Sequence, residues 1–313
     1  MPFKIDTAEN YQDLLDQTRL FATQHDWTEK RWVEKSANTE SELILQGEGI
    51  SGQDEIFVGI KTYSDTGQDY FNWQLQGMVG FDNNYSFEEQ PGVIYQEPPS
   101  LALWDKPIPY WLVVNTSRII LVAKVSTVYV SMYLGFLKVY GTPGQYPYPL
   151  IVGGSLTQNP SSQSVQNYRW SNTLGEHRSF VDPGLNNDET GATVYQRKPS
   201  GFWQPYGNRK FDDQRIYYGD NHHHIWPTIN ESATQVREGL NGERALFPLV
   251  MYERESPRGN TAKNVWGELD GCFFVSGFGV SAEDTLTIGS DTFIIVPNIH
   301  RTGVSDYWAL KLA

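Results

Sequence analysis

The chain has 313 residues and a net charge of −13 at pH 7, enough length for one large domain or two modest ones. Such an acidic surface repels phosphate backbones and anionic lipids, so we expect neither nucleic acid nor a membrane as partner. The single cysteine, Cys272, excludes an intrachain disulfide and a cysteine-rich zinc site. No secretion signal or charge-free apolar span is evident, which predicts synthesis in the cytoplasm.

The first predicted element is an amphipathic helix. Residues 6–9 fit a capping box, with Asp6 as the N-cap and Glu9 three residues later. Apolar side chains then recur at helical spacing, at Tyr11, Leu14, Leu15, Phe21 and Ala22. The pattern stops near residue 25, so we expect a surface helix that lays one apolar stripe on a sheet.

An antiparallel meander is expected to follow the helix. Aromatic residues make up 14% of the chain, which also has 28 Gly and 17 Pro, a composition typical of strands and turns. Alternating or apolar segments predict strands at 27–34, 42–46, 55–62 and 70–79. The second and third of these flank a glycine-rich connection and are expected to form a hairpin.

The most apolar stretch comes next. Residues 110–114 and 118–126 predict a second hairpin about a turn at 115–117. Residues 127–139 could be a strand or a short helix, because their periodicity does not decide between the two. The prolines and glycines of 140–154 predict a rigid, aromatic-rich loop.

The remainder divides into a polar segment and a strand-rich end. Residues 155–263 are expected to be a loop-rich docking lobe with short strands, such as 245–253. Strands are predicted at 271–276 and 307–312, and a hairpin at 285–288 and 292–296.

The expected fold class is therefore α+β and mostly antiparallel β. Residues 1–154 would form the helix and β core, 155–263 the docking lobe, and 264–313 the strands that return to the same core, with one continuous domain as the alternative. No internal repeat and no clear linker is visible.

Several segments resemble tailed-bacteriophage virion structural proteins. The resemblance covers roughly residues 6–155 and 264–313, and only fragments of the middle, such as 177–184. It is carried by YQDLLDQTRLFATQHDW, EIFVGIKTYSD, YFNWQLQG, IPYWLVVNTSRIILVAKVSTVYVSMYLGF, YGTPGQYPYPLIVGGS and the segment from WGELDGCFF to the C-terminus. It implies a place in the phage tail, at the neck, collar or baseplate, and carries no catalytic residue or cofactor to transfer.

Three polar motifs could carry chemistry. On a strand, His222 and His224 would share a face, as half of a metal site, although a polar loop or subunit contact is the simpler interpretation. Residues 182–189 resemble a calcium loop only loosely. Glu268 and Asp270 would face one way on an extended chain, as an acid/base pair or as acceptors of backbone N–H groups at a turn.

Aromatic side chains in polar or proline-rich surroundings are the main candidates for docking. Aromatics that do not reach a core often anchor interfaces, and they could instead stack on sugar rings. The interface candidates are Tyr146, Tyr148, Trp203, Tyr206, Tyr217, Tyr218 and Trp226.

The sequence thus predicts a non-catalytic virion protein of the tail, made in the host cytoplasm. It would assemble as a ring-like homo-oligomer and dock on other phage tail proteins. Two alternatives stay open. One is a tail module that binds carbohydrate or a receptor, and the other is a glycan-cleaving tail enzyme that uses Glu268 and Asp270.

Overall fold

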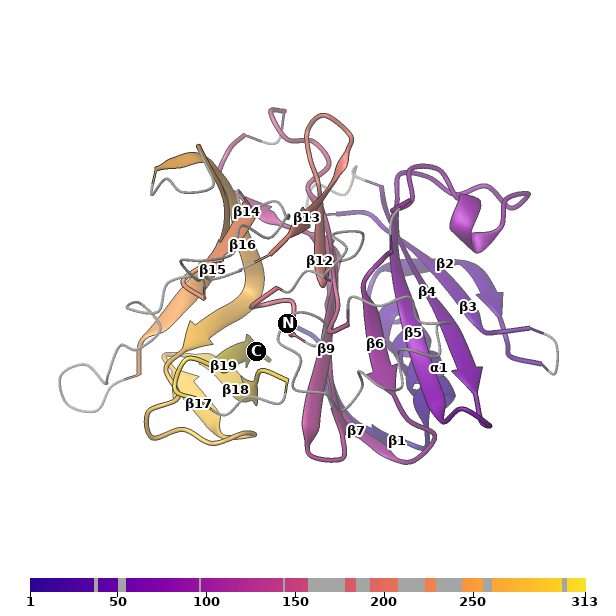
Figure 1. The fold of residues 1–313 in the computed structure, drawn as a ribbon, viewed down its shortest axis with the longest axis horizontal. Coiled ribbons are helices and arrows are strands. Elements are labelled where there is room, and N and C mark those ends of the chain that lie inside the picture. Colours follow the sequence, from indigo (N-terminus) through magenta and orange to yellow (C-terminus); the bar gives the residue numbers. More distant parts are fainter. Residues whose placement is uncertain are drawn as a thin grey trace, which may run out of the picture.

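The computed structural model describes most of the chain. The described residues are 1–36, 39–49, 55–95, 97–142, 144–156, 178–183, 192–207, 223–228, 244–255, 261–299 and 303–313. They form three antiparallel β-sheets stacked in layers, with one α-helix near the N-terminus (Figure 1). The expected α+β, mostly antiparallel fold is confirmed.

The central sheet has seven strands, and the two other sheets pack against it. Its strands, in spatial order, are β1 (Phe3–Ala8), β7 (Ile108–Asn115), β8 (Arg118–Val125), β9 (Val128–Phe136), β11 (Leu150–Gly153), β12 (Val194–Arg197) and β13 (Trp203–Tyr206). β1 and β13 are therefore its two edges.

The meander sheet covers one face of the central sheet and is built from consecutive strands. These are β2 (Trp27–Val33), β3 (Glu42–Gly47), β4 (Ile56–Asp65), β5 (Tyr70–Met78) and β6 (Ser100–Leu103), in that order. A short 3-10 helix, η1 (Phe87–Glu89), lies between the last two strands in sequence.

The C-terminal sheet covers the opposite face. Its path runs β14 (His223–Trp226), β15 (Leu246–Arg254), β16 (Ala262–Val275), β19 (Tyr307–Lys311), β18 (Asp291–Pro297) and β17 (Thr285–Ile288), and the short β10 (Lys138–Val139) also pairs with β16. The described parts of 155–263 thus add β12 and β13 to the central sheet and β14 and β15 to this one. The division of the chain at 154 and 263 stays a prediction.

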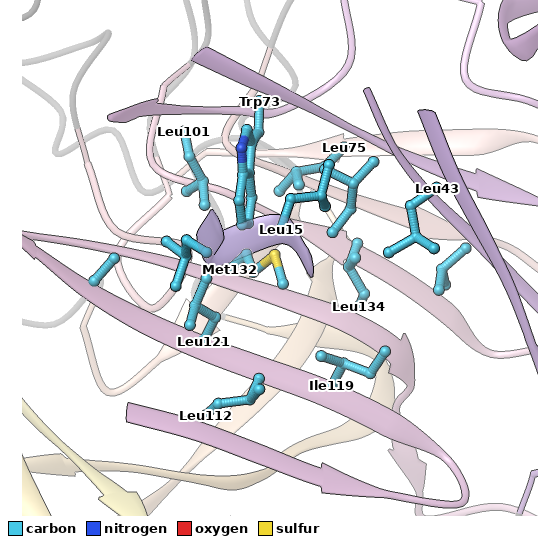
Figure 2. Close-up of a cluster of buried hydrophobic side chains, with 14 of the residues drawn as sticks. Leu15, Leu43, Trp73, Leu75, Leu101, Leu112, Ile119, Leu121, Met132 and Leu134 are labelled. Atoms are coloured by element: carbon cyan, nitrogen blue, oxygen red, sulfur yellow. The ribbon is translucent and has the colours of Figure 1, made fainter. Parts of the chain in front are cut away.

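The central sheet is buried on both faces. Successive side chains of a strand point to opposite faces, and along β8 Ile119 and Leu121 lie in one core while Ile120 and Val122 lie in another. The first core joins the central and meander sheets (Figure 2), and the second joins the central and C-terminal sheets. A strand covered on both sides needs apolar residues at every position. This explains the long apolar stretch, and it explains why residues 128–136 show no alternation although they form β9.

The predicted helix exists, but it begins later than expected. Helix α1 (Tyr11–Thr23) has Asn10 as its N-cap, whose side chain accepts hydrogen bonds from the backbone N–H groups of Gln12 and Asp13. The capping box on Asp6 was wrong, because residues 3–8 are strand β1. The apolar stripe of α1 enters the first core, where Leu15 lies among side chains of both sheets (Figure 2).

The C-terminal strands return to the central sheet, but on the face opposite to the meander. Trp308 and Leu310 of β19 lie in the second core, together with Val122 of the central sheet. The described residues therefore form two large cores where a single shared one was expected. No helix in the described ranges is long and apolar enough to cross a membrane.

The predicted hairpins are confirmed. Strands β3 and β4 pair antiparallel, as do β7 and β8, and in β17–β18 Ile288 faces Asp291 across a two-residue turn. Gly289 in that turn has φ +62, a conformation that favours glycine and is required by tight hairpin turns.

Burial on both faces makes a prediction about neighbouring positions of β8. Ile120→Ala and Leu121→Ala should each lower the free energy of unfolding by about 2–5 kcal/mol, because each leaves a cavity in a different core. The measurement is urea unfolding. Thr287→Ala, at an exposed site of β17, is the control and should change stability by no more than about 0.5 kcal/mol. A small effect at either β8 position would contradict the two-core arrangement.

Candidate functional site

An ion pair between a buried arginine and a partly exposed aspartate joins the central sheet to the C-terminal sheet. Arg118 of β8, with a side chain only 2% exposed, donates from Nη1 to Oδ2 of Asp270 on β16. The guanidinium lies beside Gly271, where a Cβ would be 3.0 Å from Nη2. Burial also raises the pKa of the neighbouring Cys272 thiol, which stays protonated in the core. Arg118 therefore fixes how the two sheets meet.

The carboxylates of β16 are used structurally. Glu268 accepts hydrogen bonds from Lys138 Nζ at 2.6 Å and from Tyr140 Oη at 2.9 Å, and Asp270 binds Arg118. The expected turn was wrong, since both residues lie within a long strand and bind side chains instead of backbone N–H groups. Each carboxylate therefore has a cation of its own.

His223 and His224 lie on strand β14. His224 is fully buried, with Nδ1 3.1 Å from the backbone oxygen of Gly207. His223 Nε2 lies 3.6 Å from Oε2 of Glu253, and His222 falls outside the described residues. In the ranges that the structure describes, no three His, Cys, Asp or Glu side chains come together to hold a metal ion.

Only the start of the calcium-like motif can be placed. Asp182 pairs with Arg178 at 3.4 Å and accepts a hydrogen bond from Asn298 Nδ2 at 3.3 Å. Residues 184–189 lie outside the described part of the chain. The contacts of Asp182 tie its turn to the end of β18, which is a structural use of the carboxylate.

Glu253 on β15 is the centre of a cationic cluster. Its carboxylate binds Lys198 Nζ at 2.8 Å, Lys263 Nζ at 3.1 Å and Asn264 Nδ2 at 3.1 Å. Burial opposes ionisation of this carboxyl, but the hydrogen bonds from Lys198, Asn264 and Lys263 outweigh it and lower its pKa to about 2. Because Lys198 follows β12, the cluster joins the far end of the central sheet to the C-terminal sheet.

Two of the predicted interface aromatics are buried within the chain itself. Tyr146 Oη accepts a hydrogen bond from Gln196 Nε2 at 2.8 Å, and Tyr206 Oη donates to Gln196 Oε1 at 2.5 Å. Tyr146 is 5% exposed, while Tyr206 and Gln196 are fully buried. Tyr146 and Tyr206 therefore serve the interior, and their assignment to a docking surface is corrected.

Tyr148 and Trp203 tie the central sheet to the meander sheet. Tyr148 Oη donates to the backbone oxygen of Met78 at 2.9 Å, and Trp203 Nε1 donates to that of Gly92 at 2.7 Å. Both side chains are half-buried against the first core. Their packing is intramolecular, and only their outer parts could meet a partner.

Trp226 is the remaining candidate that the structure places. It is half-buried and packs edge-on against Phe247, with ring centroids 6.0 Å apart. Tyr217 and Tyr218 lie outside the described residues. Docking through these three aromatics stays a prediction.

Among the residues that the structure describes, the most exposed aromatic side chains are not among those candidates. Tyr95 is 89% exposed and Phe202 is 77% exposed. Phe202 follows Gly201, whose φ of +88 marks a turn. The sequence signal for the exposure of Phe202 was its position directly after Pro-Ser-Gly, because side chains in turns point toward solvent.

Comparison with known proteins adds no assignment. No family model matches the chain, and no curated protein matches it either. The functional argument therefore depends on the geometry above and on the resemblance of the sequence segments.

The Arg118–Asp270 pair can be tested through stability. Asp270→Asn should lower the free energy of unfolding by about 3 kcal/mol, because it leaves a buried guanidinium without its counter-charge. Arg118→Met combined with Asp270→Asn should recover most of that loss in the same urea titration. Glu283→Gln breaks a more exposed pair with Lys124, and as the control it should cost at most about 1 kcal/mol.

The Glu253 cluster predicts a pH dependence. The folded-state pKa of about 2 lies below the ordinary 4.5, so the cluster contributes stability above pH 4.5 and loses it as the pH falls toward 2. The difference in unfolding free energy between wild type and Glu253→Gln should therefore shrink over this range, as measured by denaturant titrations at several pH values. Glu255→Gln, which removes an equal charge at an exposed site, is the control. A difference that is constant with pH would contradict the assignment.

Proposed function

We propose that the chain is a structural component of a tailed-phage virion that acts by self-association and by docking on other tail proteins. The resemblance of its N- and C-terminal segments to such proteins supports this role. The structural observation that carries it is a pair of highly exposed aromatics, Tyr95 and Phe202, each within three residues in sequence of a hydrogen-bonded joint between two sheets.

That joint is the hydrogen bond from Trp203 to Gly92. It connects β13, the last strand of the central sheet, with the segment that leads from η1 to β6. Phe202 precedes Trp203 directly, and Tyr95 follows Gly92 by three residues. Large apolar side chains held on a fixed base lose little freedom on binding, which suits them as interface anchors.

Assembly would place copies in a ring through a heterologous contact. Such a contact uses different patches on the two neighbours and closes when the rotation between them permits it. The neck, the collar and the baseplate are the tail positions where a ring of this kind would be used. An acidic chain suits this role, because like charge keeps free copies soluble before they assemble.

Carbohydrate binding is the second candidate function. The same exposure of Tyr95 and Phe202 that suits a protein interface would also let the rings stack on sugars. The two functions differ in what the aromatics meet, and they can be separated by experiment.

The test uses Tyr95→Ser together with Phe202→Ser, a double variant that leaves both cores intact. Its incorporation into particles should fall about tenfold or more, because interface anchors typically contribute more than 1 kcal/mol each. Mass spectrometry of purified particles measures this in a phage that supplies only the variant. Tyr85→Ser changes a different aromatic residue, which is half exposed. This control variant should be incorporated into particles normally.

Three results would separate the functions. Normal incorporation of the double variant would contradict docking through these residues. Loss of binding on a glycan array with normal incorporation would favour the carbohydrate function. A density map of the particle without the chain would overturn the virion role.

A further inference from the structure

Strand β1 presents an open edge of the central sheet. β1 pairs with β7, and within the described residues no strand pairs with its other side. The backbone oxygen of Pro2 accepts from the N–H of Val114, so even-numbered residues direct their backbone groups toward β7. The N–H and C=O groups of Phe3, Ile5 and Thr7 consequently point outward.

The same odd-numbered residues include exposed apolar side chains. Phe3 is 43% exposed and Ile5 is 53% exposed. They stand opposite Val113 and Trp111 of β7, whose side chains are buried in the second core. Phe3 and Ile5 thus extend the apolar surface of that face past the part that the C-terminal sheet covers. An apolar side-chain row beside unpaired backbone groups is a template for pairing with another strand.

The two charged side chains of β1 lie on its other face. Lys4 Nζ donates to Oε1 of Gln17 on α1 at 2.6 Å and lies 3.5 Å from Oδ2 of Asp6. The strand therefore carries one positive and one negative charge, although the whole chain is strongly acidic. This local neutrality permits two copies of β1 to approach each other.

We propose that two copies of this chain pair through β1, antiparallel and centred on Ile5, so that their central sheets become one continuous sheet. In this register Ile5 faces Ile5 of the second copy, and Lys4 faces Asp6 of the second copy. Phe3 faces Thr7 of the second copy, and the backbone N–H and C=O groups of both residues point across the interface. The contact is isologous, since each copy contributes the same patch.

Charge complementarity selects this register. Because odd residues point outward, the allowed antiparallel registers differ by shifts of two residues. Centring on Lys4 would place Lys4 opposite Lys4, and centring on Asp6 would place Asp6 opposite Asp6. Like charges directly opposite each other are destabilising, whereas the register centred on Ile5 forms two opposite-charge pairs.

Pairing exchanges one local contact for an intermolecular one. In the single chain, Asp6 Oδ1 accepts the outward N–H of Thr7 at 2.9 Å. In the pair that N–H donates across the new interface, and the Asp6 carboxylate turns to Lys4 of the second copy. The exchange leaves each of these groups with a partner.

The experiment measures the mass of the purified full chain by sedimentation velocity over a concentration series. The single chain is 35.6 kDa, and we expect a reversible dimer of twice that mass. Ile5→Lys places two like charges opposite each other at the symmetry axis, and it should raise the dimer dissociation constant at least about tenfold. Ile288→Lys, at an exposed apolar site of β17, is the matched control and should leave the dimer unchanged.

A charge-exchange experiment tests the register. Lys4→Asp alone and Asp6→Lys alone should each dimerise more weakly, because each puts like charges opposite each other. An equimolar mixture of the two variants should form heterodimers, since every pair is then opposite in sign. Thermal unfolding checks that each variant is folded, so that weaker pairing is not mistaken for misfolding.

The outcomes separate this inference from the proposed function, because the isologous β1 pair is a different contact from the heterologous contact of the ring. A wild-type chain that is monomeric at its highest soluble concentration but present in particles overturns the β1 pair and leaves the virion role standing. An oligomer unaffected by Ile5→Lys also overturns it. A dimer lost in Ile5→Lys and restored by the charge-exchange mixture supports it, even if the chain proves absent from particles.

Discussion

The architecture depends on a central sheet whose middle strands, β7, β8 and β9, are buried on both faces. Ile119, Ile120, Leu121 and Val122 are consecutive and fully buried, and they serve two cores in turn. A sheet of this kind cannot stand alone in water, so the meander sheet with α1 and the C-terminal sheet are both required as covers. The chain supplies the meander cover before the central hairpin and most of the C-terminal cover after it, while the N-terminal strand β1 joins the central sheet itself.

Polar side chains then fix how the layers meet. Arg118 bridges the central and C-terminal sheets from within, Glu253 does so near β12, and Gln196 holds Tyr146 and Tyr206 in the interior. Apolar packing tolerates small shifts between layers, whereas a buried polar group must keep its partner. These contacts therefore determine how the sheets are aligned with each other more than how strongly the sheets are held together.

The sequence predicted features that depend on residues close together in the chain, but it did not predict features that depend on distant residues. The hairpin at Gly289 and the stripe of α1 follow from residues close together in the chain. Strand β1 was missed because Asp6 and Glu9 fit a helix capping box and because its partner β7 lies beyond the entire meander. Tyr146 and Tyr206 were taken for surface residues because their neighbours are polar, yet the decisive neighbour, Gln196, is itself buried. Whether a polar residue faces water or completes an interior hydrogen bond depends on pairings that only the fold provides.

The position of β1 has a consequence for biosynthesis. Phe3 pairs with Val113, so the first strand leaves the ribosome long before its partner exists. The meander strands, by contrast, pair with near neighbours and can assemble as they emerge. Until β7 has been synthesised, the partly apolar β1 segment cannot pair with it. Neighbouring nascent chains on the same mRNA carry the same segment. The pairing of β1 with β7 is therefore a late step in completing the central sheet.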